Sequence, residues 1–442
     1  MTTRRSAWQS WVIGFMLLVG VTACGGTATP TPAPAGSTPT TAAVAPTMSA
    51  STPTAVSVTA STGATATVQG TSSAGAQGEP YRIGAVLSIT GGASTLGMPE
   101  RNTLQMLQDM VNSQGGVKGP DGQMHRLDVV IYDDQSDESQ AVLATTRLIN
   151  QDKVAAVICC TTSGATMAAI DVATRSQVPL ISLATAAGIA HPVEQRHWIF
   201  KVPWDDSMVI ERILQYLQSQ KLQRIGLLTV STEYGDSARQ AFESLRGKYG
   251  VTIAVSDRFN TGTTDVTTQL NRIRVSNVQA VVVWALPPET AVAVKNYHDL
   301  GMNIPLILSH GVATKAFIDA AGPAANGATL PAGKILVVNA IPASDPQYEA
   351  LKQYSQLYPQ RFGGPLTTFG GHAWDAFWIV EHALEKAGPD HAALRDAIEQ
   401  TKNFAGITGV FTYSPTDHVG LAPDSLVMVT IQNGAFQLLS SQ

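Results

Sequence analysis

The feature that most constrains the fold is a regular alternation of short apolar runs with helical patterns, which begins at Tyr81. The run 81–88 has the composition of a buried strand, and the Gly-rich loop 90–94 separates it from apolar residues that recur at helical spacing. Further strands are expected at 127–132, 154–159 and 179–183. Strands that alternate with helices are typical of a parallel sheet covered by helices.

The same alternation starts again at residue 224 and predicts a second sheet. Its expected strands are 224–230, 251–259, 280–284, 305–308 and 334–338. The tail differs, because two long helical patterns, 348–358 and 372–387, precede a hairpin at Asn433-Gly434. We therefore expect an α/β protein of two Rossmann-like lobes with parallel central sheets, joined by a hinge that the chain crosses several times. The expected lobes are 79–202 with 341–410, and 203–340 with 411–442.

The N-terminus has the pattern of an export signal. Arg4 and Arg5 precede an apolar run at 11–21, and small residues lead to Cys24. A cysteine directly after Val-Thr-Ala resembles the bacterial lipobox, in which the cysteine is acylated and becomes the new N-terminus. The apolar run is shorter than a comfortable membrane span. We therefore interpret residues 1–23 as a lipoprotein signal peptide rather than a retained anchor helix.

The segment after the lipobox has the composition of a linker. Between Gly25 and Gly78 there is no charged and no aromatic residue, and Thr, Ala, Pro, Ser and Gly dominate. Such a segment has too little apolar bulk to offset the entropy lost on ordering. Residues 24–78 are therefore predicted to be a disordered tether between the acylated Cys24 and the globular part.

Charge and cysteine usage narrow the class of protein. The formal net charge is −5 over 442 residues, without a basic cluster, so nucleic acid is not an expected partner. Besides Cys24, the chain has only Cys159 and Cys160. Because adjacent cysteines meet the geometry of a disulfide poorly, we expect no disulfide and interpret the pair as small buried residues at a strand end.

No group of residues has the pattern of a catalytic or metal site. Ser163 lacks the Gly-x-Ser-x-Gly frame of a nucleophile elbow, and we interpret it as a helix cap. The acidic residues at 133–138 lack calcium-loop spacing and suit a helix N-terminus. The histidines lack zinc-ligand spacing, and the loop 90–94 lacks the order of a nucleotide-binding loop. We expect no cofactor, no metal and no enzymatic activity.

Polar loops follow the carboxyl ends of the predicted strands, where open α/β sheets bind ligands. They are residues 88–97, 161–164, 184–185, 232–234, 284–287 and 309–310. In each lobe these loops would lie on one edge of the sheet. The sequence therefore predicts a ligand-binding cleft in which the two sets of loops face each other.

Several motifs, in this order and spacing, resemble the solute-binding proteins of branched-chain and hydrophobic amino-acid ABC transporters, which have the periplasmic-binding-protein type I fold. The resemblance covers residues 79–442. The motifs are Tyr81-Arg-Ile-Gly-Ala-Val-Leu-Ser-Ile-Thr-Gly91, Gly115-Gly116-Val117 with the strand that ends at Asp133-Asp134, Val178-Pro-Leu-Ile-Ser-Leu-Ala-Thr185, Glu233-Tyr234-Gly235 and Trp374-Asp375-Ala376.

The resemblance implies a set of ligand-binding residues. Backbone N–H groups and hydroxyls of the first lobe hold an amino acid's carboxylate in this family, and these positions correspond to Ser163, Ala184 and Thr185. The family's tyrosine from the second lobe corresponds to Tyr234, which would close over the ligand. Helix starts and turns offer N–H donors that suit an anion.

One position departs from the family's pattern. The family's amino-acid binders place an acid after a late strand to pair with the ligand's ammonium, and here that position is His310. Another acid could supply the charge, the match could be shifted by a residue or two, or the ligand could be a carboxylate without an amine, or a neutral amide. Trp284 and Leu96 would suit an apolar ligand group, although Trp284 equally suits ordinary core packing.

The resemblance implies an extracytoplasmic substrate-binding protein that captures a small solute by hinge closure. It would deliver the solute to an ABC permease driven by ATPase subunits, and lipid on Cys24 would hold it at the membrane. A sensor that passes closure to a signalling receptor is the alternative from another class. An exported hydrolase is a further alternative, but it needs a base beside a nucleophile, and the sequence offers none.

Overall fold

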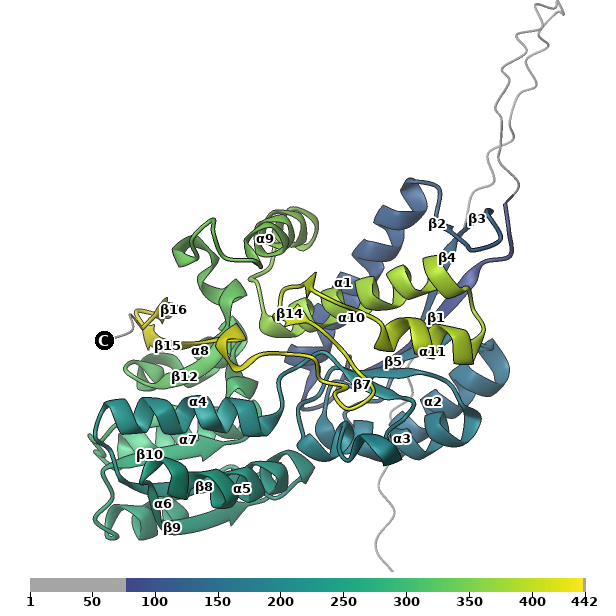
Figure 1. Ribbon diagram of the computed structural model, residues 1–442. Helices are drawn as coiled ribbons and strands as arrows, with labels where there is room; N and C mark the ends of the chain where they lie inside the picture. The colour runs from purple at the N-terminus through teal and green to yellow at the C-terminus, as the bar shows by residue number, and fades with distance from the viewer. Residues whose placement is uncertain (1–76, 440–442) are drawn as a thin grey trace, which may run out of the picture. The chain divides into compact units, whose positions relative to one another are not determined.

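The computed structural model describes residues 77–439, whose elements Figure 1 shows in order along the chain. The expected signal peptide at 1–23, the lipidation site Cys24 and almost all of the expected linker lie outside these residues. Within 77–439, no helix combines the length and the apolar character that crossing a bilayer requires.

The first sheet has five strands in the order β4-β1-β5-β6-β7, and all neighbouring pairs are parallel. The strands are β4 (Leu127–Asp133), β1 (Tyr81–Leu87), β5 (Ala156–Cys159), β6 (Leu180–Ser182) and β7 (Ile199–Lys201). Side chains of β1 alternate between faces, so that Ile83 and Leu87 join one apolar cluster and Val86 joins another. Burial on both faces explains why this strand is a continuous apolar run in the sequence.

Helices connect the strands of the first sheet. They are α1 (Ser94–Ser113), α2 (Glu138–Arg147) and α3 (Ser163–Ser176), which follow β1, β4 and β5. Local capping explains two of the starts, because the side chains of Asp137 and Thr162 accept the N–H groups of Gln140 and Ala165. Each of these helices begins at the carboxyl end of a strand, the edge at which ligands bind in such sheets.

The second sheet has seven strands in the order β16-β15-β12-β11-β10-β8-β9. They are β8 (Arg224–Val230), β9 (Thr252–Phe259), β10 (Ala280–Trp284), β11 (Leu306–Leu308), β12 (Thr329–Gly333), β15 (Leu426–Gln432) and β16 (Ala435–Leu438). The helices around it are α4 (Asp206–Ser219), α5 (Glu233–Leu245), α6 (Thr267–Arg274), α7 (Glu289–Asp299) and α8 (Lys315–Ala321). Five strands are mutually parallel, whereas β15 and β16 form the expected antiparallel hairpin, with positive φ at Asn433 and Gly434.

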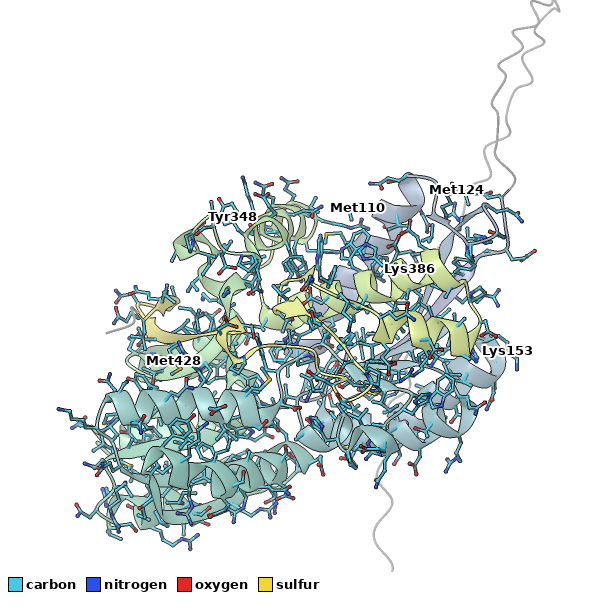
Figure 2. All side chains as sticks on the ribbon, viewed as in Figure 1. Met110, Met124, Lys153, Tyr348, Lys386 and Met428 are labelled. Carbon is cyan, nitrogen blue, oxygen red and sulfur yellow. A yellow bond between two sulfur atoms is a disulfide. The ribbon has the colours of Figure 1, made fainter. Side chains whose placement is uncertain are left out.

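Three late helices follow the second set of parallel strands. They are α9 (Tyr348–Phe362), α10 (Thr368–Ala387) and α11 (His391–Glu399). Figure 1 shows α10 beside α1 and α11 beside α10, and Figure 2 labels Met110 on α1 and Lys386 on α10. Asp375 of α10 accepts the N–H groups of Ile407 and Thr408 at 2.7 Å each. The chain therefore returns to the first sheet before it rejoins the second at β15.

Two short two-stranded sheets complete the described chain. One pairs β2 (Val117–Lys118) with β3 (Met124–His125), and the other pairs β13 (Phe404–Ala405) with β14 (Val410–Phe411). The first lies near the start of the described chain, where His125 stacks on Tyr81 with ring centroids 4.0 Å apart. Both pairs are separate from the two main sheets, and neither contributes a loop to the site.

One expected strand is wrong. The apolar run 334–338 forms short 3-10 turns, and the strand of the second sheet is β12, which ends at Gly333 just before them. β12 pairs residue by residue with β15, from Thr329 opposite Thr430 to Gly333 opposite Leu426. An apolar run signals burial but not pairing, and Ile335 and Val337 are buried without being in a strand. Among the helices and the strands of the two main sheets, β7, α4, α8 and α11 were not among the expected elements.

The expectation for the adjacent cysteines is half wrong. Cys159 and Cys160 are fully buried at the end of β5, as expected, but their sulfurs are joined in a disulfide. Adjacency in the sequence therefore does not keep these two thiols apart. Thr166 of α3 fixes the same turn, because its hydroxyl oxygen accepts the N–H of Cys160 at 3.0 Å.

Candidate functional site

A small cavity of about 20 Å³ lies between loops at the carboxyl ends of both sheets. The loops after β5 and β6 form its first-sheet wall, and the start of α5 with the loops after β10 and β11 forms its second-sheet wall. The first-sheet wall is Thr161, Thr162, Ser163, Leu183, Ala184 and Thr185; the second-sheet wall is Tyr234, Leu286, His310 and Gly311; Phe369 of α10 completes the lining. A volume of this size holds about one water molecule.

The start of α3 forms the most polar part of the first-sheet wall. Thr162 is the cap of the helix, so the capping role expected for Ser163 belongs to its neighbour. Ser163 is the first helical residue, and its Oγ accepts the N–H of Ala186 at 3.3 Å. The N–H groups of a helix's first turn lack partners within the helix, and they favour an anion there.

A buried network supports this wall from behind. The hydroxyl of Thr161 donates to Oε2 of Glu100 at 2.5 Å, and its oxygen accepts the N–H of Ser88 at 3.0 Å. Burial raises the pKa of Glu100 well above its usual range, and the charge of Asp134 adds to the effect. The sequence pattern did not indicate that Glu100 supports the site, although this residue lies on the buried face of α1.

Lys201 fixes the loop after β6. Its side chain is fully buried, and its Nζ donates to the carbonyl oxygens of Thr185 at 2.8 Å and Ala186 at 3.4 Å, and to Asp205. The N–H of Ala184, which the resemblance assigns to a ligand carboxylate, donates here to Oγ of Ser182 at 3.0 Å. The loop is thus held rigidly with its hydroxyl-bearing residue Thr185 at the cavity.

The second-sheet wall is an aromatic cluster. Tyr234 packs on Trp284 with ring centroids 5.1 Å apart, and the indole N–H of Trp284 donates to the carbonyl oxygen of Tyr234 at 3.1 Å. The hydroxyl of Tyr234 lies 3.4 Å from Nδ1 of His310. Burial lowers the pKa of His310 to about 3, assisted by the charge of Lys201. His310 is therefore neutral at physiological pH.

Close packing fixes the position of this wall. A Cβ at Gly311 would lie 2.8 Å from the hydroxyl oxygen of Tyr234 and 2.6 Å from Cδ2 of Leu286. No side chain fits there without displacing both neighbours. The tyrosine hydroxyl can therefore come close to the backbone after β11 only because residue 311 is glycine.

The structure brings most of the sequence-predicted site residues together. Ser163, Ala184, Thr185, Tyr234 and His310 all line the cavity. Trp284 lies behind Tyr234 and is fully buried, and Leu96 packs in a small cluster with the lining residues Phe369 and Leu286. A direct contact joins the two walls nearby, where the N–H of Ala187 donates to Oγ of Ser237 on α5 at 3.1 Å.

Sequence reasoning missed several residues of the site. Phe369 reaches the cavity only because α10 returns to the first sheet. Lys201 and Asp206 flank the crossover after β7, a strand of three residues that the pattern did not indicate. An available signal was the charged group Lys201-Val-Pro-Trp-Asp-Asp206 inside an otherwise apolar stretch.

Other groups considered in the sequence have structural roles. Asp133 accepts the N–H groups of Ile89 and Thr90 at 3.0 and 3.1 Å and ties the end of β4 to the loop after β1. Asp137 caps α2. Among residues 77–439, no three His, Cys, Asp or Glu side chains lie together as a metal site would require.

Comparison with known families gives a match over most of the chain. The family model described as "Periplasmic binding protein" matches residues 80–435. Among related proteins, "Leu/Ile/Val-binding protein homolog 3" of Brucella melitensis biotype 1 is 22% identical over 337 residues, which cover 76% of this chain and 87% of that protein. The Leu/Ile/Val-binding protein of Escherichia coli K12 is 25% identical over 284 residues, 64% of this chain and 74% of that protein.

Solved structures show the same likeness in three dimensions. The branched-chain amino acid transporter substrate-binding protein LivJ from Streptococcus pneumoniae, in complex with isoleucine, has a TM-score of 0.72 and 26% identity and covers 81% of this chain and 98% of its own. An extracellular ligand-binding receptor from Rhodopseudomonas palustris has a TM-score of 0.75 and 26% identity, over 81% of this chain and 99% of its own. These relatives are binding proteins rather than enzymes. The chain belongs to the periplasmic binding protein family, with the type I fold and a resemblance to its branched-chain amino-acid members.

Proposed function

We propose that this chain is the substrate-binding protein of an ABC importer, which captures a small amino-acid-like, carboxylate or amide solute between two lobes. The observation that carries the proposal is the cavity itself, which combines hydroxyls and a helix start on one wall with a buried tyrosine and histidine on the other. We assign residues 79–202 with 341–410 to the first lobe and 203–340 with 411–442 to the second.

Closure of the two walls is the second element of the proposal. A cavity of about 20 Å³ is far smaller than an amino acid, so a solute enters only when the walls move apart. The Ala187–Ser237 hydrogen bond then breaks and reforms with each cycle. A solute that contacts both walls stabilises the closed state because it gains its full set of contacts only there.

The ligand contacts follow the chemistry of the two walls. Ser163, Thr185 and the N–H groups at the start of α3 would hold the carboxylate or amide oxygen, since these are donors at the positive end of a helix. Tyr234 and His310 would contact the solute from the second lobe, and Leu286, Phe369 and Leu96 suit its apolar part.

The remaining parts of the proposal concern location and partners. The relatives named as Leu/Ile/Val-binding proteins support an extracytoplasmic role in solute transport. Acyl chains on Cys24 and the tether up to residue 78 would keep the protein near its permease and raise its effective concentration there. The permease and its ATPase subunits would move the solute, because this chain has no P-loop.

A thermal-shift screen of the purified full chain tests this function. The panel contains the twenty amino acids, short and aromatic carboxylates, simple amides and urea. A ligand that binds only the folded state raises the melting temperature, by an amount that grows with concentration. We expect at least one member to do so in wild type and less in Thr185→Val. If no member of the panel shifts the transition, the proposed function is wrong.

A ligand sensor that feeds a signalling receptor is the second candidate. It is favoured by one observation, the description of the Rhodopseudomonas palustris structure as an extracellular ligand-binding receptor. The two candidates differ in what happens to the solute. Deletion of the gene abolishes uptake of the radiolabelled solute if the protein serves an importer, whereas a sensor leaves uptake intact and alters only the response.

A further inference from the structure

A group of buried polar atoms without partners lies on α10. Both ring nitrogens of His372 and the hydroxyl of Thr368 have no hydrogen-bond partner among residues 77–439, although these residues are only 1% and 3% exposed. They lie one turn apart in the helix and therefore share one of its faces. A buried polar group without a partner is costly, so this pair invites a functional explanation.

The pair lies directly behind two residues that line the cavity. The first is Phe369, whose ring centroid is 5.7 Å from that of His372. The second is His310. Burial lowers the pKa of His372 to about 3, and the nearby His310 contributes to the shift. His372 is therefore neutral at physiological pH, so that one of its nitrogens is a donor and the other is an acceptor.

The aromatic neighbour of His372 does not supply the missing hydrogen bonds. The ring of Trp204 lies edge-on to both histidines, with centroids 5.6 Å from His372 and 6.3 Å from His310. Its indole N–H, however, donates to Oγ of Ser425 at 2.8 Å. The side chains around His372 thus leave its nitrogens free for a molecule that enters the cleft.

The surroundings of His372 do not suit an ionic group. Lys201, whose charge acts on the neighbouring His310, is paired with Asp205. Asp375, one turn after His372, accepts two backbone N–H groups. A further charge would enter a buried aromatic environment without a counter-charge, at high cost. The group that suits the pair is uncharged and both donates and accepts hydrogen bonds, as a hydroxyl or a carboxamide does.

We propose that His372 and Thr368 form a polar subsite of the cleft, which binds an uncharged hydroxyl or carboxamide group of the solute. This inference rests on the proposed function and deepens it, because it names the class of solute. In the lobe assignment above, Phe369 belongs to the first lobe and His310 to the second. Separation of the walls therefore opens a path between them to the subsite.

The subsite discriminates by what it leaves unpaired. A hydroxyl or carboxamide hydrogen-bonds the imidazole and the Thr368 hydroxyl, and the apolar part of the solute lies against Phe369. An apolar group of the same shape fills the same space but leaves the polar atoms of His372 and Thr368 without partners. Sites built to hydrogen-bond a substrate group reject the analogue that lacks it for this reason. Solutes with purely aliphatic side groups are then the poorer ligands.

Isosteric pairs of probes test this assignment by calorimetry on the full chain at pH 7.5. Two pairs are amino acids, threonine with valine and asparagine with leucine. Two lack the amine, 3-hydroxybutanoate with 3-methylbutanoate and succinamate with 4-methylpentanoate. The members of a pair have nearly the same shape and differ in one hydroxyl or carboxamide. In the pair that binds most tightly, we expect the polar member to bind at least tenfold more tightly than its isostere.

Variants on α10 separate ligand contact from packing. His372→Phe removes both nitrogens and keeps a ring beside Trp204 and Phe369, so it should reduce the ratio within that pair to less than threefold. Thr368→Val should reduce the ratio to a smaller extent. His382→Phe is the matched control, because it makes the same change on the same helix at a side chain that is 47% exposed, and it should leave the ratio intact. A purely structural role of His372 would weaken both members alike.

The outcomes separate the inference from the function on which it rests. If the apolar members bind as tightly as the polar ones, or if His372→Phe keeps the wild-type ratio, the inference is wrong and the binding function stands. The same holds if the preferred solute of the wider panel lacks a hydroxyl or carboxamide. If His372→Phe does not fold, the wild-type ratio and Thr368→Val decide. Absence of binding by all probes and by the wider panel overturns both.

Discussion

The two walls of the cavity differ in how their residues are fixed. On the first-sheet wall, Ser163 and Thr185 present hydroxyls from a helix start and from a loop that Lys201 holds through its carbonyl oxygens. On the second-sheet wall, Tyr234 and His310 belong to a packed group of rings that includes Trp284. Ligand contacts on the first wall can therefore change without loss of the fold, whereas those on the second wall are part of the core.

The largest effect is expected at Trp284. The side chain is fully buried, contacts Tyr234, Phe242 and His310, and donates to the carbonyl oxygen of Tyr234. Trp284→Ala should lower the free energy of unfolding by about 3–5 kcal/mol, measured by urea denaturation. Trp284→Phe, which keeps a ring, should lose much less. Equal stability of wild type and the alanine variant would show that the second wall is not core.

A pH effect of about 2 kcal/mol is expected from His310. Its pKa is lowered to about 3 by burial, whereas the unfolded value is near 6.5. The unfolded state therefore binds more protons between these values, so the stabilisation is complete above pH 6.5 and is lost as pH falls. The stability advantage of wild type over His310→Asn should shrink by about 2 kcal/mol from pH 7 to pH 5. A constant difference over this range would contradict a neutral buried imidazole.

The first wall should respond to mutation in affinity rather than in stability. Thr185→Val keeps the shape of the side chain and the backbone oxygen that Lys201 and Asp206 contact, but removes the hydroxyl. We expect solute affinity to fall roughly 10- to 30-fold, in line with the loss of a hydrogen bond to a charged group. The melting temperature without solute should stay within a few degrees. A large drop in that temperature with unchanged affinity would show that Thr185 belongs to the structural core and not to the ligand site.

The smallest effect is expected for the hydroxyl of Tyr234. Its oxygen lies 3.4 Å from Nδ1 of His310, a long contact, while the ring supplies the packing. Tyr234→Phe should therefore retain nearly all stability and lose several-fold in solute affinity, about 1 kcal/mol. Calorimetry and urea denaturation of the same preparation measure both. A loss as large as that of Trp284→Ala would place the hydroxyl in the structural core.

Helices and strands that show in the periodicity of apolar residues were predictable from the sequence. Strands whose position depends on hydrogen bonding to a distant strand were not. The sequence pattern indicated most parallel strands, such as β10 at Ala280–Trp284, because a buried strand is apolar throughout. It failed at 334–338, since hydrogen bonding to β15, about a hundred residues later in the chain, places the strand at Thr329–Gly333. The short strand β7 lacked enough residues to produce a pattern.

The site residues that lie on loops directly after strands were predictable from the sequence. Ser163, Thr185, Tyr234 and His310 all follow strands of the two sheets, and the sheet topology brings such loops to one edge. Phe369 and Asp206 could not be found in this way. The first depends on the return of α10 to the first sheet, and the second on a crossover whose direction no local pattern encodes.

The central claim is that a solute binds in the closed cleft and enters only when the walls separate. The walls touch directly where the N–H of Ala187 donates to Oγ of Ser237 at 3.1 Å, so Ala187→Cys with Ser237→Cys is the pair chosen to lock them by a disulfide. The measurement is calorimetric titration of the double variant with the solute that gives the largest thermal shift. We predict no binding when the lock is oxidised and wild-type binding when it is reduced. Wild-type binding by the oxidised, fully locked protein would contradict the account.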